Sequence, residues 1–193
     1  MANNYFKLRR CEEEANEDLD RSKLLGAPVM PEGFFEKLGL SESDYFIAQI
    51  NCSELPDHTY APEKGWVYLF LDIDTLQPKA FYTAEEPAEL LSEINANFDE
   101  ESCGETVAHY LDFVEESEAF VFGPKDKDLD LQAYADTEGK VTLLQIDALA
   151  LGDSKLFQFT DLAVGDGYLI FLIDKKKLAK GDFSEVSFID YGY

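Results

Sequence analysis

Apolar residues are concentrated in two N-terminal segments that have the lengths and patterns of β-strands. In residues 44–51, Phe46, Ala48 and Ile50 share one face of the expected strand. The other face carries Ile47, Gln49 and Asn51. Residues 65–74 are apolar on both faces of the expected strand. This pattern is typical of a central strand in a sheet that is covered on each side. The sequence therefore predicts two strands, the second of them central.

Both segments have a second copy further along the chain. Residues 45–51 (YFIAQIN) are echoed by residues 141–147 (VTLLQID) at a spacing of 96 residues. Residues 65–72 (GWVYLFLD) are echoed by residues 167–174 (GYLIFLID) at a spacing of 102 residues. Repeats in a constant order indicate one supersecondary unit that is built twice.

Amphipathic periodicity predicts helices in several of the other segments. Residues 6–24 have apolar residues at spacings of three and four, which is the helical period. Residues 85–130 are rich in Asp and Glu and contain two similar stripes. The stripes consist of Leu8, Cys11, Ala15 and Leu19 in the first segment, and of Leu90, Leu91, Ile94, Phe98, Val107, Tyr110, Leu111 and Val114 in the second. Residues 175–180 predict a short basic turn or helix, and residues 183–193 predict a final strand.

Together these elements predict an α+β fold with internal duplication. Two mainly antiparallel β halves, residues 22–84 and 131–193, are expected on either side of an acidic helical connector, residues 85–130. The chain has 193 residues, of which 46% are apolar, so it is long enough to bury a core. We therefore predict a single domain over residues 1–193.

The net charge narrows the range of partners. The chain has 40 acidic residues and 16 basic residues, which gives a formal net charge of −24. Such a polyanion repels nucleic-acid phosphates and anionic membrane surfaces, so no nucleic-acid or membrane partner is expected. A cationic protein partner would be attracted, although solubility alone also accounts for the charge. The apolar runs are too short for a membrane helix and the N-terminus lacks a signal-peptide core, so we expect a cytoplasmic protein.

Polar residues of the repeated strand are the first candidates for a binding site. Gln49 and Asn51 share one face of their strand, and Gln145 and Asp147 occupy the equivalent places in the second copy. If a pseudo-twofold axis relates the copies, these side chains converge at a cleft between the halves. The alternative is structural, because a buried glutamine has to satisfy neighbouring backbone groups.

Carboxylates end the other repeated strand. Asp72 and Asp174 are equivalent, and paired carboxylates can bind a divalent cation, whereas an Asp after a strand more often caps the next turn. Asp126, Asp128 and Asp130 have the spacing of a calcium loop, but that loop would lack its glycine and its final glutamate. We therefore predict no metal site and no cofactor.

No familiar catalytic constellation is present in the sequence. Cys52 and Cys103 would need an activating base, and the sequence places neither His58 nor His109 beside a thiol. Glycine-rich phosphate loops and nucleophile elbows are absent from the sequence. The lysines of residues 175–180 either hold an anion or an acidic partner, or pair with acidic groups of the chain itself.

Several sequence blocks, in a fixed order over residues 22–193, resemble a known family. They are residues 22–34 (SKLLGAPVMPEGF), 48–51 (AQIN) with 65–70 (GWVYLF), and 143–147 (LLQID) with 165–168 (GDGY) and 181–184 (GDFS). Together they resemble the YwqG-like family of bacterial proteins, a domain of unknown function. The chain departs from that family at Phe35 and Glu36, where relatives usually continue with Trp-Pro. The resemblance implies a mixed α+β fold with internal duplication, and it implies no established activity.

These observations favour a non-enzymatic binding module with a protein partner. The most specific form is an immunity-type inhibitor of a basic toxin, because acidic inhibitors gain association rate from opposite charge. The resemblance adds that some YwqG-like relatives occur in toxin–immunity gene neighbourhoods. The alternative is a small-molecule-binding protein or an enzyme with a cleft between the halves. Its binding residues would be Gln49, Asn51, Gln145, Asp147, Asp72 and Asp174.

Overall fold

Antiparallel strands make up nearly all of the regular structure. The computed structural model describes residues 4–11, 21–94, 107–114, 132–147 and 167–192. Within these residues one sheet contains ten strands: β1 (Asn4–Arg10), β2 (Lys23–Leu24), β4 (Asp44–Asn51), β5 (Trp66–Asp72), β6 (Gln77–Thr83), β8 (His109–Val114), β9 (Gln132–Thr137), β10 (Lys140–Asp147), β11 (Gly167–Asp174) and β12 (Val186–Gly192). A separate pair consists of β3 (Val29–Met30) and β7 (Glu89–Leu90).

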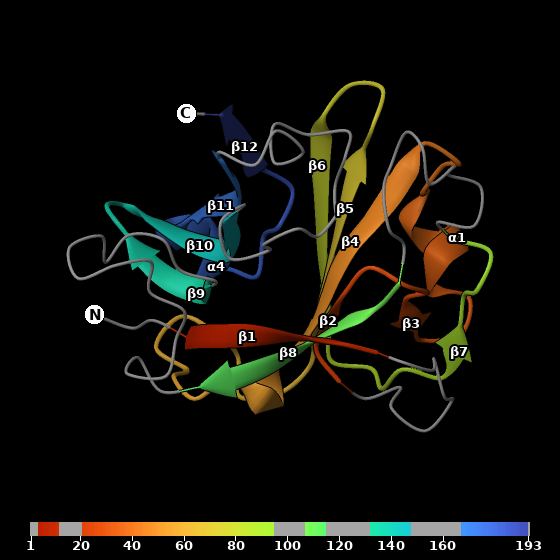
Figure 1. Cartoon of the computed structure of the whole chain (residues 1–193), viewed down its shortest axis with the longest axis horizontal. Coiled ribbons are helices and arrows are strands. Elements are labelled where there is room, and N and C mark those ends of the chain that lie inside the picture. Colours follow the sequence, from red (N-terminus) through yellow and green to blue (C-terminus); the bar gives the residue numbers. More distant parts are fainter. Residues whose placement is uncertain (1–3, 12–20, 95–106, 115–131, 148–166, 193) are drawn as a thin grey trace.

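The large sheet curves until its two ends come close together (Figure 1). Its strand order is β12-β11-β10-β9-β1-β8-β2-β4-β5-β6, and neighbouring strands are antiparallel. The edge strands β6 and β12 lie beside one another. The rings of Tyr82 and Phe183 stack across this junction, with their centroids 6.2 Å apart. The sheet is therefore a nearly closed, barrel-like structure.

One apolar core inside the barrel is built by both halves of the chain. Strand β5 contributes alternate residues from Val67 to Leu71, and β11 contributes alternate residues from Leu169 to Ile173. Aromatic side chains on the opposite face of β5 form a second cluster beneath α1 (Phe34–Leu38). Both predicted N-terminal strands are thus confirmed, and β5 is apolar on both faces because it lies between two cores.

The repeated segments form hairpins that pair in the same register. Cross-strand partners in β4–β5 and β10–β11 correspond one to one at the sequence spacings of 96 and 102 residues. A β-bulge occurs at equivalent places, Ile47 in β4 and Leu143 in β10. Next to these bulges, Leu25 and Tyr134 have positive φ values of 55° and 48°, and both side chains belong to the barrel core. An unusual backbone conformation at equivalent positions shows that the two hairpins share one local architecture.

Strands β1 and β8 each pair with a strand from the other half of the chain. Strand β8 pairs with β2, strand β1 pairs with β9, and β1 and β8 pair with each other. The β1–β8 ladder extends from the pair Tyr5–Val114 to the pair Arg10–His109. Each half of the sheet therefore includes a strand from the other half of the chain, and the exchange occurs at the centre of the sheet.

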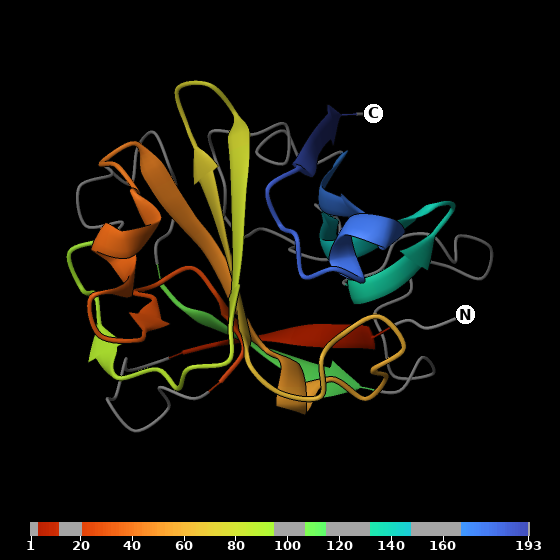
Figure 2. The same cartoon turned by 180° about the vertical axis from the view of Figure 1, so that it is seen from behind.

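The predicted α+β class is wrong, because the described residues contain very little helix. Helical structure there is limited to α1, α4 (Lys175–Leu178) and the 3-10 helix η2 (Cys52–Glu54). Figure 2 shows α1 and the β3–β7 pair on the side of β4 and β5 that faces away from β10–β12. The protein is mainly β-structure, with the helices as short additions.

The predicted N-terminal helix is wrong where the structure describes it. Residues 6–10 of that prediction lie in β1. Leu8 and Cys11 fit a helical stripe, but Phe6 and Leu8 also alternate with Lys7, and such short windows fit both periods. Pairing with β8 and β9 decides the outcome in favour of a strand. Residues 12–20 lie outside the described residues.

The predicted acidic helical connector is also wrong where it is described. Glu89 and Leu90 form β7, and residues 109–114 form β8, which completes the sheet beside β1 and β2. In β8, Leu111 joins the barrel core, while Tyr110 on the other face packs with Cys11. Residues 95–106 and 115–130 of this prediction, including the rejected calcium loop, lie outside the described residues.

Two predictions at the C-terminal end are confirmed. The short basic helix is α4, and the final strand is β12, which pairs with β11 along its length. Asp174 precedes α4 and accepts hydrogen bonds from its first backbone N–H groups, which explains why a helix starts at this point. Within the described parts of the chain, none of the helices has the length and apolar character needed to cross a membrane.

Candidate functional site

Gln49 is completely buried on the outer face of β4. Its side-chain Oε1 accepts a hydrogen bond from the backbone N–H of Val29, and its Nε2 donates to the backbone carbonyl of Arg21, both at 2.9 Å. The amide thus ties two neighbouring segments to β4. These contacts favour the structural alternative for Gln49, because each end of a buried amide requires a partner.

Asn51 and Asp174 cap short helices. Asn51 Oδ1 accepts hydrogen bonds from the backbone N–H and the hydroxyl of Ser53, at 3.0 Å and 2.7 Å. Asp174 Oδ1 accepts from the backbone N–H groups of Lys176 and Lys177, at 2.8 Å and 3.3 Å. Both side chains therefore satisfy backbone donors that a helix start would leave without partners.

Asp72 caps the turn between β5 and β6. Its Oδ1 accepts from the backbone N–H groups of Asp74 and Thr75, and its Oδ2 accepts from the Ser43 hydroxyl. Desolvation opposes ionisation of Asp72, but hydrogen bonds, above all those from Thr75, hold its pKa below the ordinary value. The turn-capping alternative given for Asp72 is thus favoured by its contacts.

The remaining predicted residues, Gln145 and Asp147, lie on β10 at the positions equivalent to Gln49 and Asn51. Asp147 is buried and Gln145 is partly exposed. Four strands separate β10 from β4 in the sheet order, so the two copies are not neighbours along the sheet. None of the six predicted residues lines the pocket described next.

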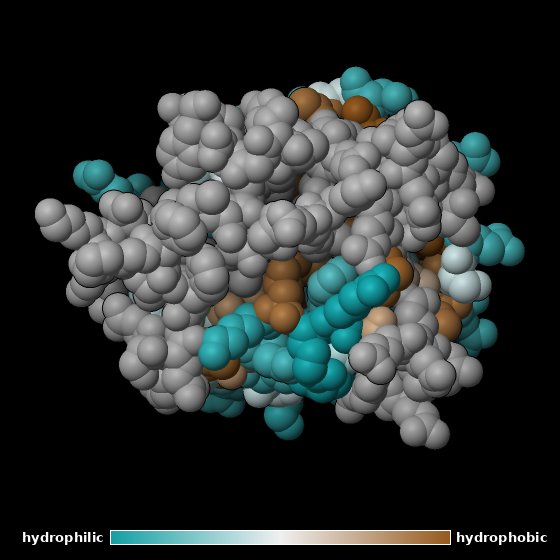
Figure 3. All heavy atoms as spheres, in the orientation of Figure 1, coloured by the Kyte–Doolittle hydropathy of each residue, from teal (hydrophilic) through white to brown (hydrophobic). Residues whose placement is uncertain are grey.

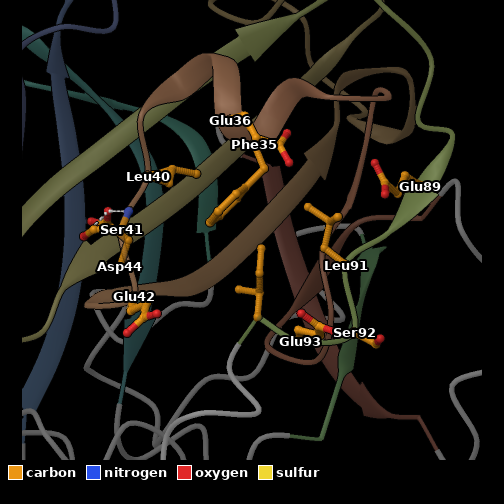
Figure 4. A pocket seen from close by; sticks show the side chains of 11 residues that line it. Phe35, Glu36, Leu40, Ser41, Glu42, Asp44, Glu89, Leu91, Ser92 and Glu93 are labelled. Atoms are coloured by element: carbon orange, nitrogen blue, oxygen red, sulfur yellow. Dashed lines mark hydrogen bonds between the residues drawn. The ribbon is translucent and has the colours of Figure 1, made fainter.

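A pocket of about 600 Å³ lies over the outer face of the first repeat (Figure 4). Its walls come from α1 with the segment that follows it, and from β7 with the segment after it. The apolar lining consists of Phe35, Leu40, Leu91 and Ile94. All four pack against the second aromatic cluster, so the floor of the pocket continues that core outward.

Carboxylates surround this apolar floor. They belong to Glu36, Glu42, Asp44, Glu89 and Glu93. In Figure 4, Glu42 and Asp44 lie on one side of Phe35, and Glu89 lies beyond Leu91 on the other side. Glu93 lies below Leu91, and Glu36 lies beside Phe35. Within the part of the chain that the structure describes, no salt bridge involves Glu36, Glu42, Glu89 or Glu93. The pocket therefore combines an apolar surface with unneutralised negative charge.

Asp44 is the buried member of this group, with 2% of its surface exposed. Its Oδ2 accepts hydrogen bonds from the backbone N–H and the hydroxyl of Ser41, and it pairs with the Lys79 ammonium at 2.6 Å. Its Oδ1 is also buried and has no donor among the described residues. The contacts of Oδ2 fix the carboxylate at the pocket wall and leave one acceptor oxygen unsatisfied.

Local sequence explains why these walls form. Helix α1 lies between Gly33 and Gly39, and both glycines have positive φ values near 65°, which other residues avoid. The chain then turns into β4 through Ser41 and Asp44. On the opposite wall, the backbone N–H of Leu91 donates to the carbonyl of Pro28 at 3.0 Å. Both walls are thus held by backbone and capping interactions.

A second charged cluster lies on the outer face of β1 and β8, where Figure 3 shows hydrophilic side chains. The guanidinium groups of Arg9 and Arg21 each lie 4.9 Å from the Tyr110 ring centroid and both bind the Asp112 carboxylate. Arg9 in particular holds the pKa of Asp112 below its ordinary value. Arg21 also lies 3.9 Å from the Glu54 carboxylate, so two carboxylates balance the two guanidinium groups and the cluster does not form an open anion site.

Of the two candidate thiols, the structure describes only Cys52, and this thiol is not activated. Burial raises the pKa of Cys52 to about 12, although the adjacent Tyr134 hydroxyl partly opposes the shift. The thiolate is the nucleophilic form, so Cys52 is inert near neutral pH. In His58 and His109, the Nδ1 atom is hydrogen bonded to a nearby backbone carbonyl. Cys103 lies outside the described residues.

Two of the three lysines of α4, Lys175 and Lys177, pair within the protein. Lys175 binds the Asp136 carboxylate and lies 5.0 Å from the centroid of the Tyr60 ring, whose hydroxyl donates to the same carboxylate. Lys177 pairs with Glu185. The hydrogen bond to Asp136 raises the pKa of Lys175. These contacts favour the alternative in which the lysines pair with acidic groups of the chain itself, rather than forming an anion site. No group of potential metal ligands occurs in the described residues.

The pocket is not predicted by the pattern of apolar and polar residues. The sequence predicts Leu91 and Ile94 in the apolar stripe of a helix within the acidic connector, and not in the wall of a pocket. The sequence does contain a signal for the pocket walls. Both wall segments, residues 35–44 and 89–94, mix apolar and acidic residues. Their proximity depends on the β3–β7 pairing, which single-sequence periodicity does not reveal.

Comparison with known proteins identifies one family over part of the chain. Residues 22–89 match the family described as "Domain of unknown function (DUF1963)". The matched region extends from β2 to the first residue of β7 and includes α1 and the first hairpin. It contains one pocket wall and Glu89 of the other. No curated protein matches the chain.

Proposed function

We propose that this protein is a non-enzymatic binding module whose acidic apolar pocket receives a cationic segment of a protein partner. One observation carries the proposal: carboxylates without ion partners in the described residues surround an apolar floor. Apolar surface favours a desolvating contact, whereas fixed negative charge favours a basic side chain. Arg and Lys have both properties, since an aliphatic stem carries their charge.

The charge of the whole chain supports the same class of partner. A formal net charge of −24 attracts a basic protein over long range and increases its association rate at low salt. It also disfavours contact between two copies of this chain. The carboxylates of the pocket would then provide the local contacts after encounter.

The finer proposals concern the family and the kind of partner. We propose that the family resemblance extends beyond residues 22–89, because the YwqG-like blocks continue into the second hairpin. We also propose a single domain and a cytoplasmic location. An immunity-type inhibitor of a basic toxin is a specific form of this function, and the overall acidity of the chain supports it.

A labelled peptide that contains lysine and leucine tests the proposal by fluorescence anisotropy. Binding is expected at low salt and should weaken steeply as salt is added. Glu42→Gln with Glu93→Gln should weaken binding about tenfold, since exposed ion pairs contribute ~0.5–1 kcal/mol each. The matched control removes two charges elsewhere, with Glu63→Gln and Glu138→Gln, and should change affinity little. Equal losses in both variants would show that only bulk charge matters.

A small organic cation is a second candidate occupant. The volume of the pocket, about 600 Å³, lies in the range typical of small-molecule sites. Thermal unfolding with a series of aliphatic amines distinguishes this function, because a ligand at ~100 times its dissociation constant adds ~2.7 kcal/mol of stability. A rise in melting temperature that Glu42→Gln removes would favour the small cation. Unchanged melting curves would leave the protein segment as the proposed occupant.

A further inference from the structure

From the geometry of the pocket we infer the pattern that the partner segment carries: one apolar side chain with a basic residue on each side. The apolar side chain occupies the floor at Phe35 and Leu91. One basic residue contacts Glu42, and the other contacts Glu89 and Glu93. This inference rests on the proposed function and specifies the chemistry of its partner.

Four of the five pocket carboxylates belong to two wall segments, and the fifth, Glu36, belongs to α1. Glu42 and Asp44 belong to the connection from α1 into β4, whereas Glu89 and Glu93 belong to β7 and the segment after it. Figure 4 shows Phe35 and Leu91 between Glu42 and Asp44 on one side and Glu89 on the other. A ligand that covers the floor therefore meets negative charge at both ends.

Both walls are held in place before any ligand binds. On one wall, the Ser41 and Lys79 contacts fix Asp44, and the Phe34 ring of α1 packs against Tyr68 with centroids 6.2 Å apart. On the other wall, β7 pairs with β3. Fixed walls reduce the entropy cost of binding, and they set the spacing between the charged groups.

The buried oxygen of Asp44 adds an independent indication of a donor at one end. Asp44 lines the pocket, and its Oδ1 has no hydrogen-bond donor among the described residues. A buried acceptor without a donor is unfavourable, so a donor that reached this oxygen after a local rearrangement of the wall would gain binding energy. The basic residue that contacts Glu42 supplies N–H donors at this end of the pocket.

Other segment patterns use the pocket less well. A run of basic residues leaves the apolar floor exposed to water or places a charge on it, which is costly. An apolar segment without basic neighbours desolvates the carboxylates and leaves them unpaired. The interleaved order satisfies the floor and both carboxylate groups at once, as interface cores with polar rims do.

Two labelled peptides of identical composition test the order of residues. In the first, single leucines are each flanked by lysines, and in the second the leucines and lysines are separated into blocks. Anisotropy titrations at low salt should give the interleaved peptide about tenfold higher affinity. Equal affinities would overturn the inference and leave the proposed function intact. If neither peptide binds, the inference and the proposed function both fail.

Variants at the two walls make the test independent of overall charge. Glu42→Gln should remove the affinity that the lysine on one side of the leucine contributes. Glu93→Gln should remove the affinity that the lysine on the other side contributes. A double-mutant cycle with peptides that lack one lysine measures each pairing. The two-ended arrangement would be contradicted if neither glutamate had a coupling energy with a lysine. It would also be contradicted if both glutamates were coupled to the same lysine.

Blocking the pocket without changing its charge supplies a further control. Ser92 is exposed at the pocket lining, so Ser92→Trp should obstruct the floor and remove the preference for the interleaved peptide. Ala179→Trp, at an exposed position after α4, should keep that preference. If the preference survives Ser92→Trp, the peptide binds elsewhere. If an aliphatic diamine displaces the interleaved peptide at equal concentration, the protein segment is overturned as the occupant.

Discussion

Gly65 is a residue whose missing side chain allows two strands to approach. Its φ is 99°, and an added Cβ would lie 2.7 Å from the Thr83 carbonyl oxygen and from the Tyr82 side chain. Gly65→Ala therefore combines backbone strain with a clash against backbone atoms. We expect it to lower the free energy of unfolding by more than about 2 kcal/mol in urea titrations.

Gly139→Ala is the matched control for this prediction. Gly139 also has a positive φ, 75°, but no atom lies within 4 Å of an added Cβ. Only the backbone strain remains, so the expected loss is ~1 kcal/mol. Equal losses in the two variants would show that the clash at Gly65 is relieved by a small shift.

Cys52 gives the stability of the protein a dependence on alkaline pH. Its pKa is about 12 in the folded protein, against an ordinary value of 9.0. Below pH 9 the thiol is protonated in both states, and between pH 9 and 12 only the unfolded chain releases the proton. Stability from this group is therefore present at low pH and falls as pH rises, on the order of 1.4 kcal/mol per pH unit.

Urea titrations across this alkaline range check the effect of Cys52. Cys52→Ala should reduce the slope of unfolding free energy against pH by the contribution of one proton. Burial also raises the pKa of Tyr68, which contributes equally in both proteins. An unchanged slope in the variant would show that the Cys52 thiol ionises in the folded state.

At the residue scale, the sequence predicts which residues of the two repeats are equivalent, but it does not predict what their side chains contact. The repeat placed Gln49 and Gln145 at matching positions, and the registers of their hairpins agree with that placement. It did not reveal that Gln49 bonds to the backbone of Val29 and Arg21, because those contacts depend on how β2 and β3 fold over β4. The pocket depends on the same packing and was therefore missed.

At the scale of elements, the sequence predicts the long repeated strands correctly, whereas it predicts helix where β1 and β8 form. Strands β4, β5, β10 and β11 are long and carry a strong apolar signal, and their repetition reinforces it. Strands β1 and β8 have half-polar patterns over few residues, which also fit a helical period. Their strand conformation comes from partners that are distant in sequence, so local periodicity does not determine it.

The turn between β5 and β6 offers a stabilising substitution. Leu76 has a φ of 54° and is 41% exposed, so it carries left-handed strain without burying its side chain fully. We expect Leu76→Gly to raise the free energy of unfolding by ~0.5–1 kcal/mol, after the entropy cost of glycine is subtracted. Thr75→Gly, one residue earlier in the same turn, should instead lower it. Urea titrations compare the two, and a loss in both would mean that Leu76 contributes more by packing than by strain.

At the scale of the whole molecule, the exchange of β1 and β8 joins the two repeats into one structure. Each hairpin lies in a half-sheet that needs a strand from the other half of the chain. The barrel core also draws its residues from both repeats. Neither repeat has a complete sheet or core alone, so we expect the two repeats to fold together.

This connection predicts a single cooperative unfolding transition. Trp66, the only tryptophan, lies in β5 of the first repeat, so its fluorescence reports on that repeat, whereas far-ultraviolet circular dichroism reports on all strands. If the repeats depend on each other, both signals should change at the same urea concentration. The control is Phe183→Ala, which removes the stack with Tyr82 at the barrel junction and should shift both curves together. A fluorescence transition separate from the circular dichroism transition would show that the first repeat unfolds on its own, despite its borrowed strand.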